Sequence, residues 1–310
     1  MNSLERFRGC LLGLAAGDAV GTTAEFKPRG TFSPVTDMVG GGPFGLKPGQ
    51  WTDDTSMALC LATSLIRAGG FDAADQMELY CRWYKDGYLS STGRCFDIGN
   101  TTREALEQYL ASGNPFSGPT HPRSAGNGCL MRLAPVPMFY CTQGELGISR
   151  ESRAAHFSGE SSRTTHGAAE CIDASRLFGA MLFRALLGAS KAEILFERDA
   201  AMVESPSIKA IANGAYRDKS IDDIHGTGYV VASLEAALWC FWTTETFEAA
   251  ILAAVNLGDD ADTTAAICGQ VAGAYYGESA IPSPWLEQLT MRAEITELAD
   301  QLYAAEPADT

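Results

Sequence analysis

Hydrophobic and polar positions alternate along much of the chain with the three-to-four-residue spacing of amphipathic helices. Alanine-rich apolar segments with this spacing predict helices at residues 4–16, 55–68, 73–85, 101–112, 167–188, 191–204, 230–242, 245–255, 264–276 and 285–304. A few short strands fit the remaining segments, but no β-α-β alternation supports a parallel sheet. We therefore expect an all-α fold.

Glycine and proline collect in the three segments between these helices that are too irregular for a long element, at residues 27–50, 113–128 and 205–228. Such loops are the places to search for function. No linker-like tract, fixed-period repeat or shift in composition marks a boundary. The sequence therefore predicts one domain that spans residues 1–310.

The composition excludes several classes of protein and favours an ordinary globular one. With 46% hydrophobic residues in 310, the chain can bury a deep site. The net charge of −15, without clusters of lysine and arginine, argues against a nucleic-acid partner. Nine scattered cysteines without a C-x-x-C pair argue against a disulfide framework or a zinc knuckle. We expect a cytoplasmic protein.

The first residues share features with a signal peptide, because Arg6 and Arg8 precede the apolar run 10–16. That run is short, however, and Asp18 follows it at once among glycines, so we expect a buried helix that enters a loop. No segment is long enough to span a bilayer.

Two short segments combine acids with hydroxyl residues directly before an apolar helical run. They are the first acidic cluster, Thr52-Asp53-Asp54-Thr55, and the second acidic cluster, Asp260-Ala261-Asp262-Thr263. Both have the composition of a helix N-terminus. Because the clusters lie far apart in the sequence, a site that joins them has to be made by the global fold.

Oxygen ligands alone favour hard cations, so Mg²⁺ or Mn²⁺ suits these clusters better than zinc. Four carboxylates, those of Asp53, Asp54, Asp260 and Asp262, would balance two divalent charges. The alternative is that each cluster only caps its helix, as Asp and Thr often do. A cap needs one side chain, whereas each cluster supplies three or four.

The chain resembles the ADP-ribosylglycohydrolases, which include the dinitrogenase reductase-activating glycohydrolases. The matching segments are Arg8–Gly21 with Glu25-Phe26, Trp51–Thr55, Phe96–Gly99, Gly126–Gly128 with Met131-Arg132, Thr165-His166 and Gly258–Thr263. They span nearly the whole chain in the family's order. The resemblance implies a compact orthogonal helical bundle with a binuclear Mg²⁺ or Mn²⁺ site in a central cleft that takes ADP-ribose.

Residue roles also follow from the resemblance. The metal ligands would be Thr52, Asp53, Asp54, Asp260, Asp262 and Thr263, with Glu25 as a mobile acid beside them. The substrate would contact Asp97, Ile98, Gly99, Ser124, Gly126, Asn127, Gly128 and His166. Taken alone, the loop at residues 124–128 fits a plain turn, and Asp97 fits a helix cap.

One position departs from the family pattern, because some relatives have an aromatic residue where Ala125 stands. Any stacking on the substrate would then come from elsewhere, and Phe96, Tyr229 and Phe116 are the candidates.

The resemblance implies that a metal-positioned water attacks ribose C1″ through an oxocarbenium-like transition state. Asp53, Asp54 or Glu25 would accept its proton. We expect ADP-ribosyl-arginine on a protein to be the substrate, and serine, nucleic-acid or small-molecule conjugates of ADP-ribose are alternative substrates. We expect the protein to act as a monomer.

Three other functions also fit the sequence. They are an ADP-ribose binder without activity, an immunity protein that blocks a toxin, and a two-metal phosphoesterase.

Overall fold

Helices form the regular structure of the described chain, which in this computed structural model comprises residues 2–142, 148–196 and 203–305. The α-helices are α1 (Ser3–Gly21), α2 (Asp53–Ala68), α3 (Ala73–Asp86), α4 (Asn100–Ser112), α5 (Pro135–Cys141), α6 (Ile148–Thr165), α7 (Ala169–Leu186), α8 (Lys191–Phe196), α9 (Pro206–Ala212), α10 (Val230–Thr243), α11 (Phe247–Val255), α12 (Ala261–Tyr276), α13 (Ser283–Gln288) and α14 (Arg292–Ala304). Three short 3-10 helices, at Pro122–Ser124, Ile221–Asp223 and Glu278–Ala280, connect some of them. The described residues contain isolated β-bridges but no strand. The all-α prediction is confirmed.

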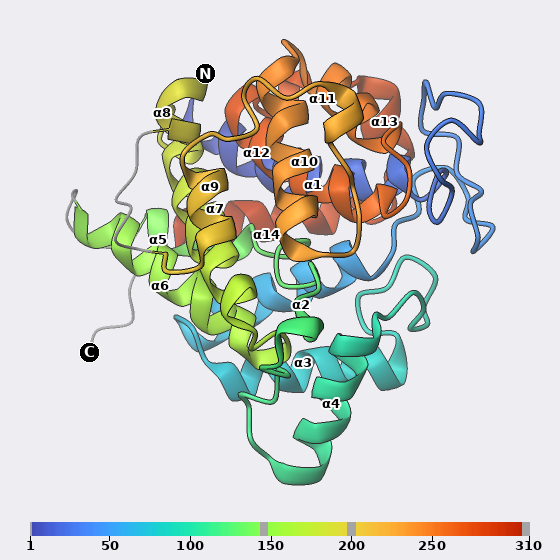
Figure 1. Cartoon of the computed structure of the whole chain (residues 1–310). Helices are drawn as coiled ribbons and strands as arrows, with labels where there is room; N and C mark the ends of the chain where they lie inside the picture. Colours follow the sequence, from blue (N-terminus) through green and yellow to red (C-terminus); the bar gives the residue numbers. More distant parts are fainter. Residues whose placement is uncertain (1, 143–147, 197–202, 306–310) are drawn as a thin grey trace.

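Helices α1 and α12 pack against each other at the centre of the fold (Figure 1). Their backbones touch through glycines, because a Cβ atom built on Gly13 would lie 2.4 Å from the carbonyl oxygen of Gly269. Gly9 meets Gly273 in the same way, one turn further along. The predicted buried helix at the start of the chain is confirmed, but it continues through Asp18 to Gly21 instead of entering a loop there. This contact brings the end of α1 beside the beginning of α12.

Local signals explain where several helices begin and end. The Asp72 carboxylate caps α3 by accepting from the backbone N–H groups of Ala74 and Asp75 at 2.9 and 3.0 Å. Gly69 and Gly87 end α2 and α3 in the left-handed conformation, with φ of 67° at both positions. Both ends agree closely with the predicted helices 55–68 and 73–85.

Two helices were not predicted from the hydrophobic pattern. One is α5, which contains two prolines, and the other is α6. The buried face of α6 consists largely of small polar residues, among them Ser158, Ser161, Ser162 and Thr164. It packs on α7, where a Cβ atom at Gly179 would lie only 2.2 Å from Ser158 Oγ. A helix that is buried through serine and threonine carries no apolar stripe to detect.

The segment 205–228 contains only the seven-residue α9 and a short 3-10 helix, in agreement with the prediction that it holds no long element. Two other predictions are corrected by the structure. The predicted helix 191–204 is helical only over Lys191–Phe196, and its residues 197–202 lie outside the described ranges. The predicted helix 285–304 is two helices, α13 and α14, because the intervening Met291 has φ of 56° and breaks the helical path.

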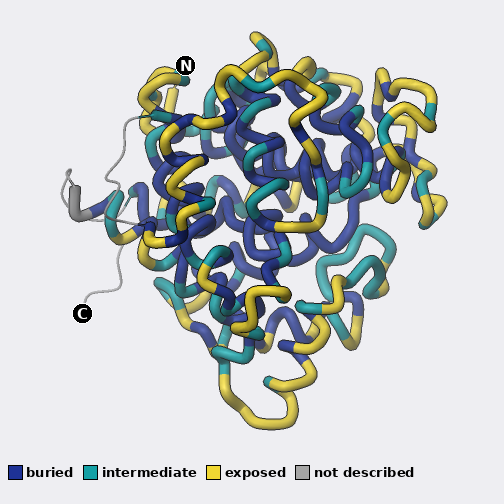
Figure 2. The backbone as a smooth tube through the Cα atoms, viewed as in Figure 1, coloured by how far each residue is buried: buried dark blue, intermediate teal, exposed yellow. Residues whose placement is uncertain are grey.

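Buried residues, dark blue in Figure 2, fill the interior, and exposed residues, yellow, concentrate in the loops and on the outer faces of helices. The described helices share one cluster of buried hydrophobic side chains. None of these helices is long and apolar enough to cross a membrane. The segment 27–50 extends outward from the helices between the end of α1 and the beginning of α2 (Figure 1).

Candidate active site

The fold brings the two acidic clusters together at the N-termini of α2 and α12. The Thr263 hydroxyl donates to Asp54 Oδ1 at 3.2 Å, across 209 residues of sequence. The Thr52 hydroxyl oxygen lies 3.4 Å from Asp262 Oδ2. Hydroxyl and carboxylate oxygens from both helix starts therefore face one small volume.

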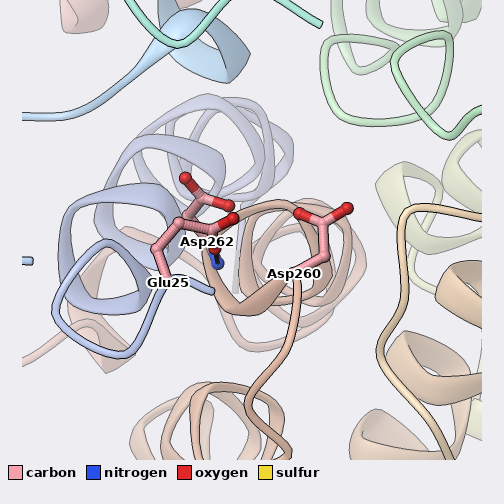
Figure 3. A group of neighbouring side chains, drawn as sticks. All are labelled: Glu25, Asp260 and Asp262. Carbon is pink, nitrogen blue, oxygen red and sulfur yellow. Dashed lines mark hydrogen bonds between the residues drawn. The ribbon is translucent and has the colours of Figure 1, made fainter. Parts of the chain in front are cut away.

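Glu25 lies in the turn after α1 and joins the second acidic cluster. One oxygen of each of Glu25, Asp260 and Asp262 lies within 4.8 Å of the others, so this trio can hold a metal ion (Figure 3). Glu25 is only 3% exposed, and its Oε2 accepts from the backbone N–H of Ala261 at 2.8 Å and of Asp262 at 3.2 Å. The Glu25 carboxylate thus accepts hydrogen bonds from the otherwise free N–H groups at the start of α12.

A second acid, which sequence reasoning did not assign to the site, acts in the same way at the start of α2. Asp18 is fully buried in α1. Its Oδ1 accepts from the backbone N–H and the hydroxyl of Thr52, both at 2.9 Å. Its Oδ2 accepts from the N–H and the hydroxyl of Thr55, at 3.0 and 2.6 Å. A lone carboxylate inside an apolar helix is the signal that could have revealed it.

These contacts bear on the alternative that the clusters merely cap their helices. Neither Thr52 nor Asp260, the N-cap residues of α2 and α12, makes a side-chain capping bond. Asp18 and Glu25, which lie outside the clusters, supply carboxylate acceptors instead. Helix capping therefore does not account for the carboxylates of Asp53, Asp54 and Asp260.

Asp18→Asn should weaken metal binding without removing a candidate ligand. The new amide group would face either the two Thr52 donors or the two Thr55 donors, so two hydrogen bonds are lost and two donors are left buried. We expect a loss of about 2 kcal/mol in the free energy of unfolding and a tenfold or greater loss in Mg²⁺ affinity, by calorimetry. Asp300→Asn, which breaks only the partly exposed pair with Arg8, is the matched control. Equal effects in both variants would contradict the positioning role of Asp18.

The donor set of the site fits a hard cation. Asp54 is 1% exposed, and its Oδ2 has no hydrogen-bond partner. Burial, followed by the charges of Asp18 and Asp262, raises the pKa of Asp54 well above its ordinary value. An unpartnered buried oxygen among several like charges is costly unless a cation neutralises it. The site therefore has the oxygen donors and the unmet charge that a divalent cation requires.

The second acidic cluster predicts how the free energy of unfolding of the metal-free protein depends on pH. Burial raises the pKa of Asp262 to about 7, above the value of about 4 for an unfolded aspartate. The protonated carboxyl is favoured by folding, so its contribution is full below about pH 4 and is lost as the pH rises through about 7. Bound cations favour the ionised form instead. The gain in melting temperature on adding Mg²⁺ to protein in EDTA should therefore grow from pH 5 to pH 8, and a pH-independent gain would contradict this reading.

A cleft with a volume of about 710 Å³ opens above the acids. Its lining includes Glu25, Asp53, Asp260, Asp262 and Thr263. Thr52 and Asp54 do not line it, because they lie beneath its floor, 0% and 1% exposed. The predicted metal residues thus form the floor of the cleft and the layer under it.

One wall of the cleft is the loop Gly126-Asn127-Gly128. The Asn127 side-chain amide donates to Asp260 Oδ2 at 2.8 Å and so ties this loop to the second acidic cluster. Ser124, a predicted substrate contact, is not among the residues that line the cleft. It belongs to the 3-10 helix Pro122–Ser124, which precedes the loop.

His166 lies against the same loop. A Cβ atom at Gly128 would come within 2.7 Å of His166 Cε1, so the imidazole fills the space that glycine leaves. Burial, and then the charge of Arg132, lower the pKa of His166 to about 3, which keeps the ring neutral. Arg132, 1% exposed, donates to the Gly128 carbonyl at 2.7 Å and to the Thr165 hydroxyl, which lies 2.9 Å from His166 Nδ1. The buried guanidinium thereby supports both the loop and the histidine.

The segment Asp97-Ile98-Gly99 also lines the cleft. Asp97 has φ of 62° and does not cap α4, whose N-cap residue is Gly99. Burial, and then the charge of Asp53, raise the pKa of Asp97 to about 11. Of the three candidate stacking aromatics, Phe96 lines the cleft, whereas Tyr229 and Phe116 do not.

Comparisons with known proteins agree with this geometry. The family profile described as ADP-ribosylglycohydrolase matches residues 1–310. A protein of Serratia proteamaculans named ADP-ribosylarginine hydrolase Tri1 is 47% identical over 309 residues, which cover 99% of this chain and 81% of that protein. The ADP-ribosyl-[dinitrogen reductase] glycohydrolase of Rhodospirillum rubrum is 34% identical, with 94% of this chain and 92% of that protein covered. A solved structure titled ADP-ribosylglycohydrolase-related protein complex superposes with a TM-score of 0.85 at 42% identity, over 98% of both chains. The chain belongs to the ADP-ribosylglycohydrolase family, whose members hydrolyse ADP-ribosyl glycosidic bonds.

Proposed function

We propose that this protein removes ADP-ribose from modified arginine residues of proteins. The observation that carries the proposal is the meeting of two acidic helix starts, with an unpartnered Asp54 oxygen, beneath a cleft walled by a glycine-rich loop. Arginine as the acceptor is supported by the relatives from Serratia proteamaculans and Pseudomonas putida, both 47% identical and both named ADP-ribosylarginine hydrolases.

The proposed cofactors are two divalent cations, Mg²⁺ or Mn²⁺, because the donor set is built of oxygen atoms. The residues proposed to hold them are Thr52, Asp53, Asp54, Asp260, Asp262 and Thr263. Glu25 lies close enough to Asp260 and Asp262 to share in the same site. Such cations supply Lewis acidity that polarises their oxygen ligands.

The reaction breaks the bond between ribose C1″ and a guanidino nitrogen. Water adds its hydroxyl to C1″, and its remaining proton ends on the departing arginine. Asp53, Asp54 or Glu25 is proposed to accept that proton first. Asp53 and Glu25 line the cleft, where a carboxylate beside the attacked carbon also stabilises an oxocarbenium-like transition state, whereas Asp54 lies beneath the floor.

The substrate is proposed to lie along the cleft with its diphosphate on the wall at Gly126, Asn127 and Gly128. The N–H groups of Gly126 and Asn127 already donate to the Ser124 and Gly228 carbonyls. The Gly128 N–H is therefore the one proposed to face the anion, in a loop that carries no acid of its own. His166, neutral and packed on the loop, would donate or accept one hydrogen bond there. The ribose would lie over the acidic floor, near Asp97, Ile98 and Gly99.

The test is to incubate the protein with arginine-linked and serine-linked ADP-ribosyl peptides, with EDTA, Mg²⁺ or Mn²⁺, and to identify the products by mass. Release of intact ADP-ribose from the arginine peptide, only with metal, is the expected result. AMP release would instead indicate a phosphoesterase. Calorimetric binding of ADP-ribose without turnover of either peptide would indicate a binder.

We further propose that residues 1–310 act as one domain, as a monomer in the cytoplasm, on an ADP-ribosylated protein partner. The shared hydrophobic core supports a single unit. All nine cysteines are free thiols, which suits a reducing compartment. Sedimentation velocity in Mg²⁺ tests the monomer.

A further inference from the structure

Three phenylalanines, Phe26, Phe44 and Phe96, form an aromatic rim on the cleft. The rings of Phe26 and Phe44 meet edge to face with centroids 6.4 Å apart, and those of Phe44 and Phe96 do so at 5.3 Å. All three line the cleft. Within the described residues, none of the three belongs to the hydrophobic core or packs against it. The rim therefore contributes little to the interior of the fold.

Both the exposure and the backbone conformation of Phe26 are energetically unfavourable. Its side chain is 64% exposed, although large apolar side chains are usually buried. Its φ of 60° lies in the left-handed region, which bulky residues rarely adopt. The Phe26 N–H donates to the Asp259 carbonyl at 2.8 Å, which fixes the backbone next to the second acidic cluster. A strained, exposed ring beside an acidic site points to a ligand contact.

The charges around the rim are unbalanced. Phe26 follows Glu25 directly, and Phe96 precedes Asp97. The cleft lining contains five acids, Glu25, Asp53, Asp97, Asp260 and Asp262, against one arginine, Arg103. Bound divalent cations would balance the carboxylates of the cleft floor, and the raised pKa of Asp97 favours its neutral form. The ring faces therefore supply the main attraction for a planar organic cation.

The shape of the proposed substrate leaves the rim for the acceptor. With the diphosphate on the Gly126–Gly128 loop and the ribose over the acidic floor, the group beyond C1″ points to the remaining lining. In an arginine conjugate that group is a ribosylated guanidinium, which stays planar and cationic. It matches the rim in shape and in charge.

We propose that Phe26, Phe44 and Phe96 form the acceptor subsite, which selects a guanidinium leaving group by ring contact. This inference rests on the proposed function and adds the residues that set its specificity. Free ADP-ribose has no acceptor and so should not use the rim.

Phe26→Ala, Phe44→Ala and Phe96→Ala test the subsite on an arginine-linked ADP-ribosyl peptide. Each change should lower kcat/KM about tenfold, mainly through KM, because a desolvated cation–ring contact is lost. Phe44→Leu, which keeps apolar volume but has no ring face, should lose as much as Phe44→Ala. Phe26→Tyr keeps the ring and should remain within twofold of the wild type. Calorimetric affinity for ADP-ribose should stay within twofold in every variant.

Tyr303→Ala is the matched control, because Tyr303 is another partly exposed aromatic, 40% accessible, that does not line the cleft. It should leave kinetics unchanged. Unchanged kcat/KM in all rim variants, or an equal loss of ADP-ribose affinity, would overturn the subsite while leaving the proposed function intact. Failure of the wild type to cleave the arginine peptide, with ADP-ribose still bound, would overturn the proposed function and the subsite with it.

Discussion

Asp54→Asn should raise the melting temperature of the metal-free protein and abolish both its response to Mg²⁺ and its hydrolysis of ADP-ribosyl conjugates. Asp54 lies beneath the cleft floor with one unpartnered oxygen, among the carboxylates of Asp18, Asp53 and Asp262. Without a cation, removal of one charge relieves repulsion. With a cation, the same change removes a candidate ligand, and with it the stabilisation that ligand binding adds to the folded state.

Thermal unfolding in EDTA and in saturating Mg²⁺, with hydrolysis measured on the same samples, checks this expectation. We expect a loss of Mg²⁺ affinity of at least about a hundredfold, since a ligand to the cation has gone. Asp300→Asn, at the partly exposed pair with Arg8, should leave both measurements as in the wild type. A variant at Asp54 that melts lower in EDTA and still gains stability from Mg²⁺ would show that this carboxylate is structural.

Gly269→Ala should destabilise the protein by about 3 kcal/mol or more, one of the largest effects of any single methyl group in this fold. A Cβ atom at Gly269 would lie 2.0 Å from the Gly13 carbonyl oxygen, and backbone cannot move aside as a side chain does. Helices α1 and α12 would have to separate. Since α1 carries Asp18 and α12 begins at the second acidic cluster, Mg²⁺ affinity should fall with stability.

Urea unfolding and Mg²⁺ calorimetry measure the two effects. Gly70→Ala is the matched control, because its new Cβ would meet only the Tyr140 hydroxyl, at 3.7 Å. We expect it to stay within about 0.5 kcal/mol of the wild type. A similar small effect at Gly269 would mean that the two helices can move apart freely, against the packing described above.

The helices that were predicted correctly are those with an apolar stripe and a clear end. Helix α3 is an example, with Asp72 before it and Gly87 after it. Helix α6 was missed because serine and threonine line its buried face, so burial leaves no hydrophobic period. The break before α14 was missed because it depends on the left-handed backbone of Met291, a residue type that gives no turn signal.

Some residues of the site could be predicted from the sequence and others could not. Both acidic clusters stand out in the sequence as acids and hydroxyls before helices, and they gave the correct segments for the floor of the cleft. Asp18 did not stand out as a site residue, since its role depends on four hydrogen bonds to a helix that begins 35 residues later. The aromatic rim draws on two connections, that between α1 and α2 for Phe26 and Phe44 and that between α3 and α4 for Phe96. Of the three rings, the sequence singles out only Phe96 as a candidate for stacking.

By itself, the sequence determined the helical class, the glycine-rich segments, the excess of acidic over basic residues and the family, because these depend on residue type and local spacing. The tertiary structure alone decided that Asp18 and Glu25 accept from the free N–H groups at the helix starts, so that Asp53, Asp54 and Asp260 are not needed as caps. It also decided which aromatic rings reach the cleft. These facts depend on the close approach of α1 to α12, and such an approach is set by the packing of the whole chain rather than by any one segment.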